Sequence, residues 1–221
     1  MKPKALIAWS SGKDSTWALY QARLAGEFEI VGALTTITEN FDRVSMHGVR
    51  RDILEAQVEA AKLPLIPVMI PFPCPNEIYE LRMGEATKAA NAAGVTKIVF
   101  GDLFLEDIRA YREEKLRGTG IEAVFPLWKI PTGSLARDMI AGGLKARVVA
   151  LDPARVPREL AGKTFDEKLL TALPAGVDPC AENGEFHTCV VGGPLFENDL
   201  EVKAGEVVER DGFVFADLML A

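Results

Sequence analysis

The chain is poor in the residues that bind transition metals or form disulfides. Its 221 residues include two histidines, His47 and His187, and three cysteines, Cys74, Cys180 and Cys189. The cysteines form no CxxC pair and show no zinc-ligand spacing, and an odd number of them in a cytosolic chain indicates reduced thiols. The composition therefore excludes a disulfide framework and a histidine-rich metal site.

The sequence also lacks a long apolar run and an excess of positive charge. No apolar stretch approaches the roughly 20 residues that span a bilayer, and a strand pattern stands where a signal peptide would begin, so we expect a cytoplasmic protein without membrane contact. The formal net charge of −7 makes nucleic acid an unlikely partner, because binding to a phosphate backbone depends on clustered Lys and Arg. A local basic patch at Arg43, Arg50 and Arg51 stays open.

What the sequence does contain is a regular alternation of apolar runs and helical patterns. Such an alternation predicts βαβ units with right-handed crossovers. We therefore expect an α/β fold with a five-stranded parallel sheet and helices on both faces. The expected strands are the run from Ala5 and residues 29–37, 65–70, 97–100 and 122–125. The expected helices are residues 14–25, with Trp17, Ala18, Ala22 and Leu24 facing inward, and residues 49–62, 76–93 and 106–118.

The pattern changes after the Pro126-Leu127-Trp128 stretch. It predicts helices at residues 132–142 and 166–173, and strands at residues 146–151, 186–191, 200–203, 207–210 and 213–218. The Asp211-Gly212 pair between the last two strands is a strong hairpin signal. We therefore expect a smaller C-terminal α+β domain at residues 128–221, which follows a first domain at residues 1–127.

The segment Ser10–Ser15 (SSGKDS) follows the first expected strand and opens a helix. Backbone N–H groups and the positive end of the helix dipole converge in such a turn, which predicts a phosphate site. The segment is not a Walker A loop, because Asp14 follows the Gly-Lys pair and Ile7 stands where that motif begins with glycine. An ordinary strand-to-helix turn with a Ser or Asp N-cap is the alternative.

Two other polar stretches follow expected strands. Gly101-Asp102 ends the fourth strand, and its carboxylate could hold Mg²⁺ that bridges phosphate oxygens, or cap the next helix. Residues 38–48 follow the second strand, where open α/β sheets place ligands. They carry polar side chains, among them Asn40, Asp42, Arg43 and His47. This segment is either a lid that contacts the acceptor or a solvated connection.

Residues 180–188 (CAENGEFHT) gather two carboxylates, an amide, a histidine and a hydroxyl just before a strand. This density is unusual for a structural loop, because binding groups concentrate on loops of a rigid scaffold. We interpret the cluster as an acceptor site in which Glu182 and Glu185 bind an amine or a trimethylammonium group. His187 is then a candidate general base near neutral pH. The alternative is a turn at the Asn-Gly pair with the histidine half buried on a strand.

Together these motifs resemble the diphthine–ammonia ligase family of ATP pyrophosphatases. The resemblance covers nearly the whole chain and rests on Ser10–Ser15, Gly101-Asp102, Pro126-Leu127-Trp128, Glu182–Thr188 and Gly193-Pro194-Leu195-Phe196. It implies the Rossmann-like HUP fold of the adenine-nucleotide α-hydrolases, with residues 1–127 binding ATP and residues 128–221 binding the acceptor. Ser11 and Ala181 stand where the family pattern has glycine.

The resemblance implies an AMP-forming amide ligase. Such an enzyme adenylates the carboxylate of diphthine on elongation factor 2, releases pyrophosphate, and lets ammonia displace AMP. RNA-modifying ATP pyrophosphatases and nucleotide-binding sensors of the same fold are the alternatives. The acceptor, the ammonia source and the oligomeric state stay open, with a homodimer as one alternative.

The resemblance also assigns roles to residues, with ATP and Mg²⁺ as cofactors. It assigns the phosphates to Ser10, Ser11, Gly12, Lys13, Asp14 and Ser15, with Lys13 at the loop tip to neutralise the leaving pyrophosphate. It assigns the nucleotide or its metal to Gly101 and Asp102. It assigns the acceptor to Glu182, Asn183, Gly184, Glu185, His187 and Thr188, and His47 of the 38–48 segment is a further candidate for contact with the acceptor. The expected catalytic residues are Lys13, Asp14, Glu185 and His187.

Overall fold

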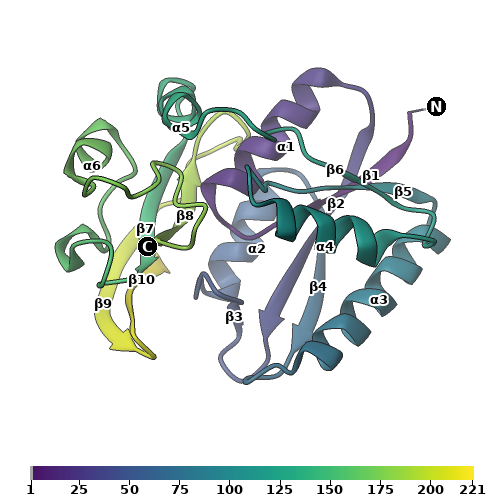
Figure 1. The fold of residues 1–221 in the computed structure, drawn as a ribbon, viewed down its shortest axis with the longest axis horizontal. Coiled ribbons are helices and arrows are strands. Elements are labelled where there is room, and N and C mark those ends of the chain that lie inside the picture. Colours follow the sequence, from purple (N-terminus) through teal and green to yellow (C-terminus); the bar gives the residue numbers. More distant parts are fainter. Residues whose placement is uncertain (1) are drawn as a thin grey trace.

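The structure is a computed structural model that describes residues 2–221. A mostly parallel sheet with helices forms the N-terminal half, and a smaller antiparallel sheet with short helices lies beside it (Figure 1). The predicted fold class, an α/β sheet followed by an α+β region, is confirmed. The domain boundary after residue 127 stays a prediction. Within the described residues, no helix combines the length and the apolar character that a membrane crossing requires.

The first sheet is built on five parallel strands: β1 (Lys4–Ala8), β2 (Glu29–Thr38), β4 (Leu65–Ile70), β5 (Val95–Val99) and β6 (Glu122–Val124). Their pairing gives the spatial order β4-β2-β1-β5-β6. The strand order reverses between β1 and β5, and open α/β sheets bind ligands at such a switch point. The two-residue strand β3 (Arg43–Val44) pairs antiparallel with the end of β2. The sequence did not predict β3, because two residues are too few to show an alternating pattern.

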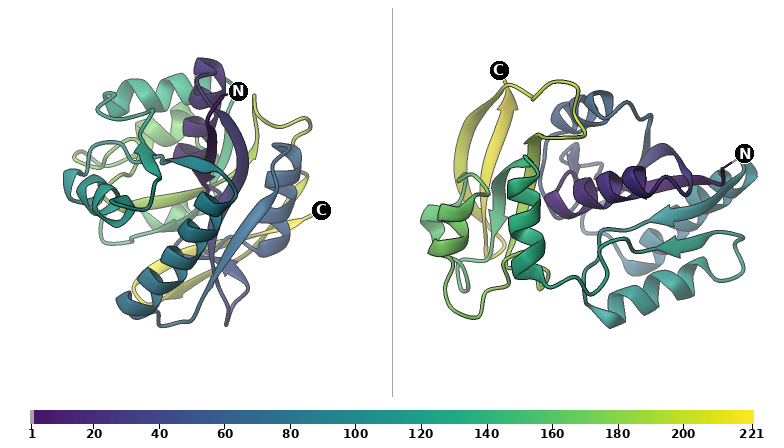
Figure 2. Two further views of the ribbon diagram at one scale, coloured as in Figure 1. Left: turned by 90° about the vertical axis from the view of Figure 1, so that its right-hand side faces the viewer. Right: turned by 90° about the horizontal axis from the view of Figure 1, so that it is seen from above.

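The helices cover both faces of this sheet, as predicted (Figure 2). Side chains of α1 (Lys13–Ala25) and α2 (Arg51–Ala60) pack in one apolar cluster. Side chains of α3 (Asn76–Ala92) and α4 (Glu106–Leu116) pack in a second cluster on the other face. Each face of the parallel sheet is thereby buried, which accounts for the continuous apolar runs of its strands.

The inward face of α1 was predicted correctly at three of its four positions. Trp17, Ala18 and Ala22 are buried, whereas Leu24 is 63% exposed. Leu24 follows Trp17 by two helical turns and lies on the same side, but it falls in the last turn before Gly26 ends the helix. Helical periodicity shows which side faces the core, but it does not show where the covering elements end.

The second sheet contains β7 (Lys145–Leu151), β8 (Phe186–Gly192), β9 (Val202–Arg210) and β10 (Phe213–Leu220), in the order β8-β7-β10-β9. The helices of this half are α5 (Thr132–Ala141), the 3₁₀ turn η1 (Arg158–Leu160) and α6 (Glu167–Ala172). The expected strands at 200–203 and 207–210 are wrong as separate elements, because β9 runs through Gly205 without a break. A β-bulge accommodates the irregularity, because Gly205 and Glu206 of β9 together lie opposite Asp217 alone in β10. The predicted Asp211-Gly212 hairpin is present, with φ values of 51° and 82°.

The two halves share one hydrophobic cluster. It extends from α1 and α2 through α5 into the second sheet, where Phe186 and Cys189 of β8 belong to it. Trp17 of α1 packs so closely on Gly142, at the end of α5, that a Cβ on this glycine would lie 2.4 Å from the indole. The shared core therefore fixes how residues of the two halves lie relative to one another.

Replacing Gly142 with Ala should destabilise the protein by about 1–3 kcal/mol, because the added methyl group has no space beside Trp17. The φ of Gly142 is −73°, so any residue can adopt its backbone and the loss would report packing alone. Gly133→Ala in α5 is the matched control, because its Cβ would lie 3.7 Å from Arg137, an ordinary contact. Urea unfolding measures both variants, and equal transition midpoints would contradict the packing argument.

Candidate functional site

A cavity of about 260 Å³ lies at the carboxyl ends of β1 and β5. From the N-terminal half it is lined by Ala8, Ser10, Lys13, Asp14, Ser15, His47, Phe100, Gly101, Asp102 and Arg112. From the C-terminal half it is lined by Ala181, Glu182, Gly184, Phe186, His187 and Thr188. A larger cavity, of about 660 Å³, lies between α3 and the sheet, but it has mainly aliphatic walls and none of the predicted site residues.

Most of the predicted site residues are therefore brought together around one cavity. The lining of the cavity does not include four of the predicted residues: Ser11, Gly12, Asn183 and Glu185. Phe100 and Arg112 line the cavity although the sequence analysis did not single them out. Arg112 lies on α4, in a run rich in charged residues that gave no signal of a site.

The serine side chains of the phosphate loop hold its turn. Ser10 Oγ accepts the N–H of Gly12 at 3.4 Å and lies 3.1 Å from Ser15 Oγ, which donates to the Gly12 carbonyl at 3.1 Å. Ser11 adopts a left-handed φ of 68°, a conformation that favours glycine. Its side chain is fully buried, and its Oγ has no hydrogen-bond partner within residues 2–221. The loop is thus strained at the position where serine replaces the family glycine.

The second sheet and α2 hold the loop from behind. Thr188 Oγ1 of β8 accepts the N–H of Lys13 at 3.0 Å and caps the start of α1, and the N–H of Val190 donates to the Ser11 carbonyl at 2.9 Å. Gln57 of α2 is fully buried and donates to the carbonyls of Ser11 and Val190, at 3.2 and 2.6 Å. Gln57 was not among the predicted site residues, although a polar residue on the apolar face of a predicted helix was a usable signal.

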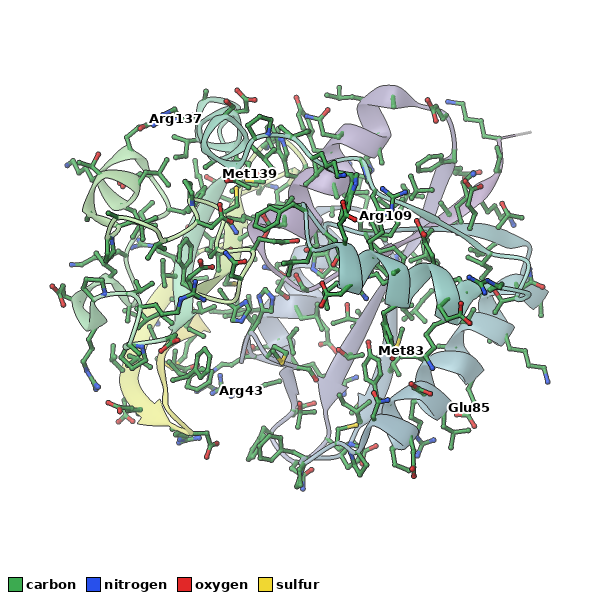
Figure 3. The ribbon with its side chains drawn as sticks, viewed as in Figure 1. Arg43, Met83, Glu85, Arg109, Arg137 and Met139 are labelled. Carbon is green, nitrogen blue, oxygen red and sulfur yellow. The ribbon has the colours of Figure 1, made fainter. Side chains whose placement is uncertain are left out.

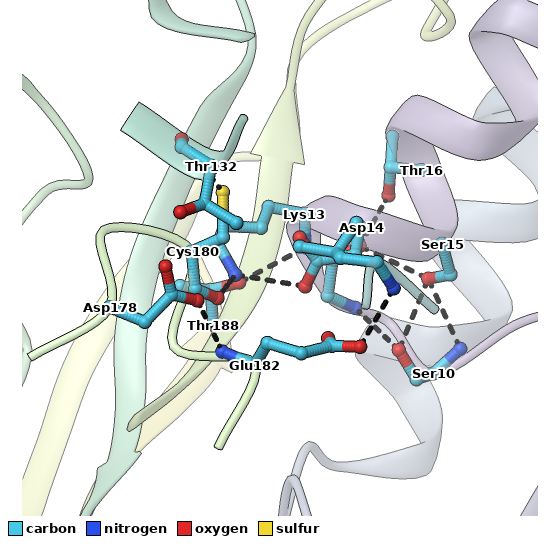
Figure 4. A network of polar contacts seen from close by, with 12 residues as sticks. Ser10, Lys13, Asp14, Ser15, Thr16, Thr132, Asp178, Cys180, Glu182 and Thr188 are labelled. Atoms are coloured by element: carbon cyan, nitrogen blue, oxygen red, sulfur yellow. Dashed lines mark hydrogen bonds and ion pairs between the residues drawn. The ribbon is translucent and has the colours of Figure 1, made fainter. Parts of the chain in front are cut away.

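Lys13 lies between the two halves, and its expected place at the loop tip is wrong (Figure 4). Its side chain is 2% exposed, and Nζ pairs with Asp14 Oδ2 at 2.8 Å. Nζ also donates to the carbonyl of Cys180 and lies over the rings of Phe165 and Phe186. Burial alone would lower the pKa of Lys13, but the nearby anionic groups, with Asp14 foremost, raise it overall. The ammonium therefore stays charged inside the protein.

Asp14 offers a carboxylate oxygen to the cavity. Its Oδ2 is held by Lys13, whereas its Oδ1 is buried and has no hydrogen-bond partner in the described part of the chain. Burial raises the pKa of Asp14, against the opposing effect of the Lys13 charge. An unpartnered buried acceptor is costly, which indicates that a ligand, an ion or water completes its hydrogen bonding.

Glu182 closes the cavity from the C-terminal half. Its Oε1 accepts the N–H of Leu103 at 2.7 Å, at the carboxyl end of β5, so the segment after Cys180 spans the gap between the halves. Burial, with added repulsion from Asp14 and Asp102, raises the pKa of Glu182 to about 7. This carboxyl group is therefore poised to change its charge near neutral pH.

Asp102 pairs with Arg112, which donates from Nε at 2.7 Å and from Nη2 at 3.2 Å to its two oxygens. No group of three or more His, Cys, Asp or Glu among residues 2–221 could hold a metal ion. The residues thus fit a Mg²⁺ ion only if most of its ligands are water molecules and phosphate oxygens. The pairing with Arg112 disfavours the predicted metal role of Asp102.

The two histidines meet over the phosphate loop. The rings of His47 and His187 have centroids 4.6 Å apart, and His47 Nδ1 lies 3.2 Å from the Thr188 carbonyl. A Cβ on Gly12 would lie 2.7 Å from His47 Cε1, so the imidazole rests directly on the loop. Burial and the charge of Lys13 lower the pKa of His187 to about 4, and burial with His187 lowers that of His47 well below its usual value. Both imidazoles are therefore neutral at physiological pH.

The segment that carries His47 is fixed to the second sheet. Arg43 Nη1 and Arg50 Nη2 donate to the Asp217 carboxylate of β10 at 2.8 and 2.6 Å, and Figure 3 shows Arg43 at this junction. Arg51 pairs with Glu55 at 2.8 Å. The three arginines do not form the basic patch that the sequence left open, because carboxylates neutralise them.

Glu185 and Asn183 shape the loop instead of facing the cavity. Glu185 is fully buried, and its Oε1 accepts from Arg155 at 2.8 Å, from Asn183 Nδ2 at 3.1 Å and from the Asp178 N–H at 3.2 Å. Burial would raise the pKa of Glu185, but these hydrogen bonds, with that of Asn183 foremost, lower it overall. This placement does not support direct contact of Glu185 or Asn183 with an acceptor, and it gives both a positioning role.

Replacing Gln57 with Leu should destabilise the protein by about 2–4 kcal/mol, because the Trp9 indole N–H and the Val190 carbonyl lose buried partners. The predicted phosphate loop should also lose rigidity, since the Ser11 carbonyl keeps only the N–H of Val190 as a partner. Glu59→Gln on the exposed side of α2 is the control. Chemical denaturation measures the free energy of unfolding, and a loss no larger than that of the control would contradict this role.

Comparison with known proteins agrees with this geometry. Residues 1–123 match the Diphthamide synthase N-terminal domain family, and residues 132–216 match the Diphthamide synthase C-terminal domain family. The chain is 26% identical to the diphthine–ammonia ligase of Schizosaccharomyces pombe, over 95% of this chain but 37% of that protein, so it spans little more than a third of that relative. It is also 26% identical to the diphthine–ammonia ligase of Homo sapiens, over 98% of this chain and 88% of the human protein. The chain belongs to the diphthamide synthase family.

Proposed function

We propose that the protein is an AMP-forming amide ligase that adenylates the carboxylate of diphthine on elongation factor 2 and amidates it with ammonia. Family membership supports this proposal. The observation that carries it is the cavity at the β1–β5 switch point, where a phosphate loop faces a polar segment of the other half. ATP and the acceptor would enter this cavity from opposite sides.

The phosphate loop would hold the triphosphate. The N-terminus of α1 opens on the cavity, and Ser10, Asp14 and Ser15 line it there. A helix N-terminus with small residues is a general phosphate site. The β5 end approaches it closely, because a Cβ on Gly101 would lie 2.8 Å from the Asp14 and Ser15 backbone. The fit to an anion is supported by Arg112, which also lines the cavity and whose charge Asp102 shares.

Adenylation then needs positioning more than covalent catalysis. In-line attack of a carboxylate on the α-phosphorus breaks the bond to pyrophosphate, and preorganised charge stabilises the leaving group. The buried ammonium of Lys13 would stabilise the negative charge of the leaving pyrophosphate from behind the loop. Mg²⁺, when bound with the triphosphate, supplies further charge neutralisation. Glu182 and His187 would face the acceptor, whose chemistry combines a cationic trimethylammonium group with a carboxylate.

Replacing Asp14 with Ala should reduce AMP formation about 100-fold or more, at a temperature where circular dichroism shows the variant still folded, because Lys13 loses the carboxylate that holds it at the loop. Asp138→Ala, at an exposed position of α5, is the control and should keep full activity. The assay incubates protein with ATP, Mg²⁺ and diphthine-bearing elongation factor 2, and separates the nucleotides. AMP with pyrophosphate supports the ligase. ADP would contradict it, and binding without turnover would favour a nucleotide-binding sensor.

ATP binding near neutral pH should take up a proton at Glu182. The pKa of this carboxyl group is about 7, so at neutral pH about half of the molecules carry it deprotonated. The negative charge of a nearby triphosphate raises this pKa further, and the deprotonated molecules therefore take up a proton on binding. Calorimetry in buffers of different ionisation enthalpy measures the proton uptake. Glu182→Gln should abolish it, while the parent protein should lose it well below neutral pH, where Glu182 is already protonated. Proton release on binding would contradict the assignment.

A further inference from the structure

We propose that His47 is the base that takes a proton from the attacking nitrogen when ammonia displaces AMP. The inference rests on the proposed amide ligase function and adds a catalytic residue to it. His47 was expected only to contact the acceptor, yet its placement, its tautomer and its surroundings together suit a proton acceptor.

The placement puts His47 between the two reacting partners. Its imidazole lines the cavity and lies against Gly12 of the phosphate loop, where the nucleotide would bind. On its other side it contacts His187, which belongs to the acceptor segment. A group in this position lies at the junction where an acyl-adenylate would be attacked.

The tautomer of His47 is fixed by the protein. Its Nδ1 lies 3.2 Å from the carbonyl oxygen of Thr188, and a carbonyl only accepts hydrogen bonds, so Nδ1 carries the proton. The lone pair of the neutral ring is therefore on Nε2. Thr188 is itself held, because its side chain accepts the N–H of Lys13 at 3.0 Å. No hydrogen bond within residues 2–221 selects a tautomer for His187 in the same way.

The surroundings keep this ring neutral. Lys13 faces it from α1 and His187 from β8, while Asp14, Asp102 and Glu182 stand around the same cavity. Burial, His187 and Lys13 together lower the pKa of His47 well below its usual value.

A weak base is sufficient for the step. The ammonia lone pair forms a C–N bond with the acyl carbon, and the nitrogen becomes positively charged and therefore acidic. A proton passes from this nitrogen to Nε2, the C–O bond to AMP breaks, and the electron pair leaves with AMP. The products are the amide and AMP, and the proton on His47 returns to solvent.

The second sheet would set the position of this base. The clamp of Arg43 and Arg50 on Asp217 fixes both ends of the turn that contains His47. Arg43 also donates to the Gly48 carbonyl at 2.7 Å. Asp217 is thus a positioning residue, and Asp217→Asn should weaken amidation less than removal of the imidazole does.

The test separates the two half-reactions of the enzyme. With diphthine-bearing elongation factor 2 from cells that lack this ligase, exchange of pyrophosphate into ATP reports adenylation, and amide formation with ammonium chloride reports the complete reaction. For His47→Gln we expect amide formation to fall about 100-fold, a typical contribution of a general base, while exchange changes less than about threefold. Met46→Ala, at the neighbouring exposed position, should change neither reaction.

Chemical rescue distinguishes a base from a structural contact. Added imidazole should restore part of the amidation in His47→Ala and leave His47→Gln unchanged, because only the smaller side chain vacates space for it. Unchanged amidation in both variants, or equal loss of exchange and amidation, would overturn the proposal. Absence of pyrophosphate exchange in the parent protein would overturn the ligase function itself. This failure is distinguishable from failure of the His47 proposal, because it is seen without any substitution.

Discussion

The buried ammonium of Lys13 is the constraint on which the rest of the site depends. A charge that is 2% exposed must be compensated, and here the compensation comes from Asp14 beside it and from the Cys180 carbonyl of the other half. Removing one partner of such a pair is strongly destabilising, because it leaves an uncompensated buried charge. The start of α1 and the acceptor segment are therefore held together by the same group.

The site exists only where the two halves meet. The first sheet provides the switch point and the phosphate loop, as parallel α/β sheets generally do. The second sheet caps α1 through Thr188, holds the loop through Val190 and anchors the His47 segment through Asp217. The proposed nucleotide and acceptor sites thus lie on different halves of the chain, and one continuous core fixes the halves relative to one another.

The elements of the fold were largely predictable because their signals are local. Apolar alternation and helical periodicity depend on neighbours in the sequence, and they located the strands of the first sheet and the hairpin at Asp211-Gly212. The errors arose where tertiary contacts decide. Leu24 is exposed although it lies on the inward side of α1, and β9 is continuous because a bulge at Gly205 and Glu206 lets it stay paired with β10.

The sequence by itself identified the family and predicted the phosphate loop and the polar segment before β8 as site motifs, because each is a short motif with its own chemistry. Only the tertiary structure decided what each side chain does. Lys13 points to Cys180, Asp102 pairs with Arg112, and Glu185 turns inward to Arg155. These partners lie far apart in the chain or on different elements, and burial selects them by the cost of leaving a charge unpaired.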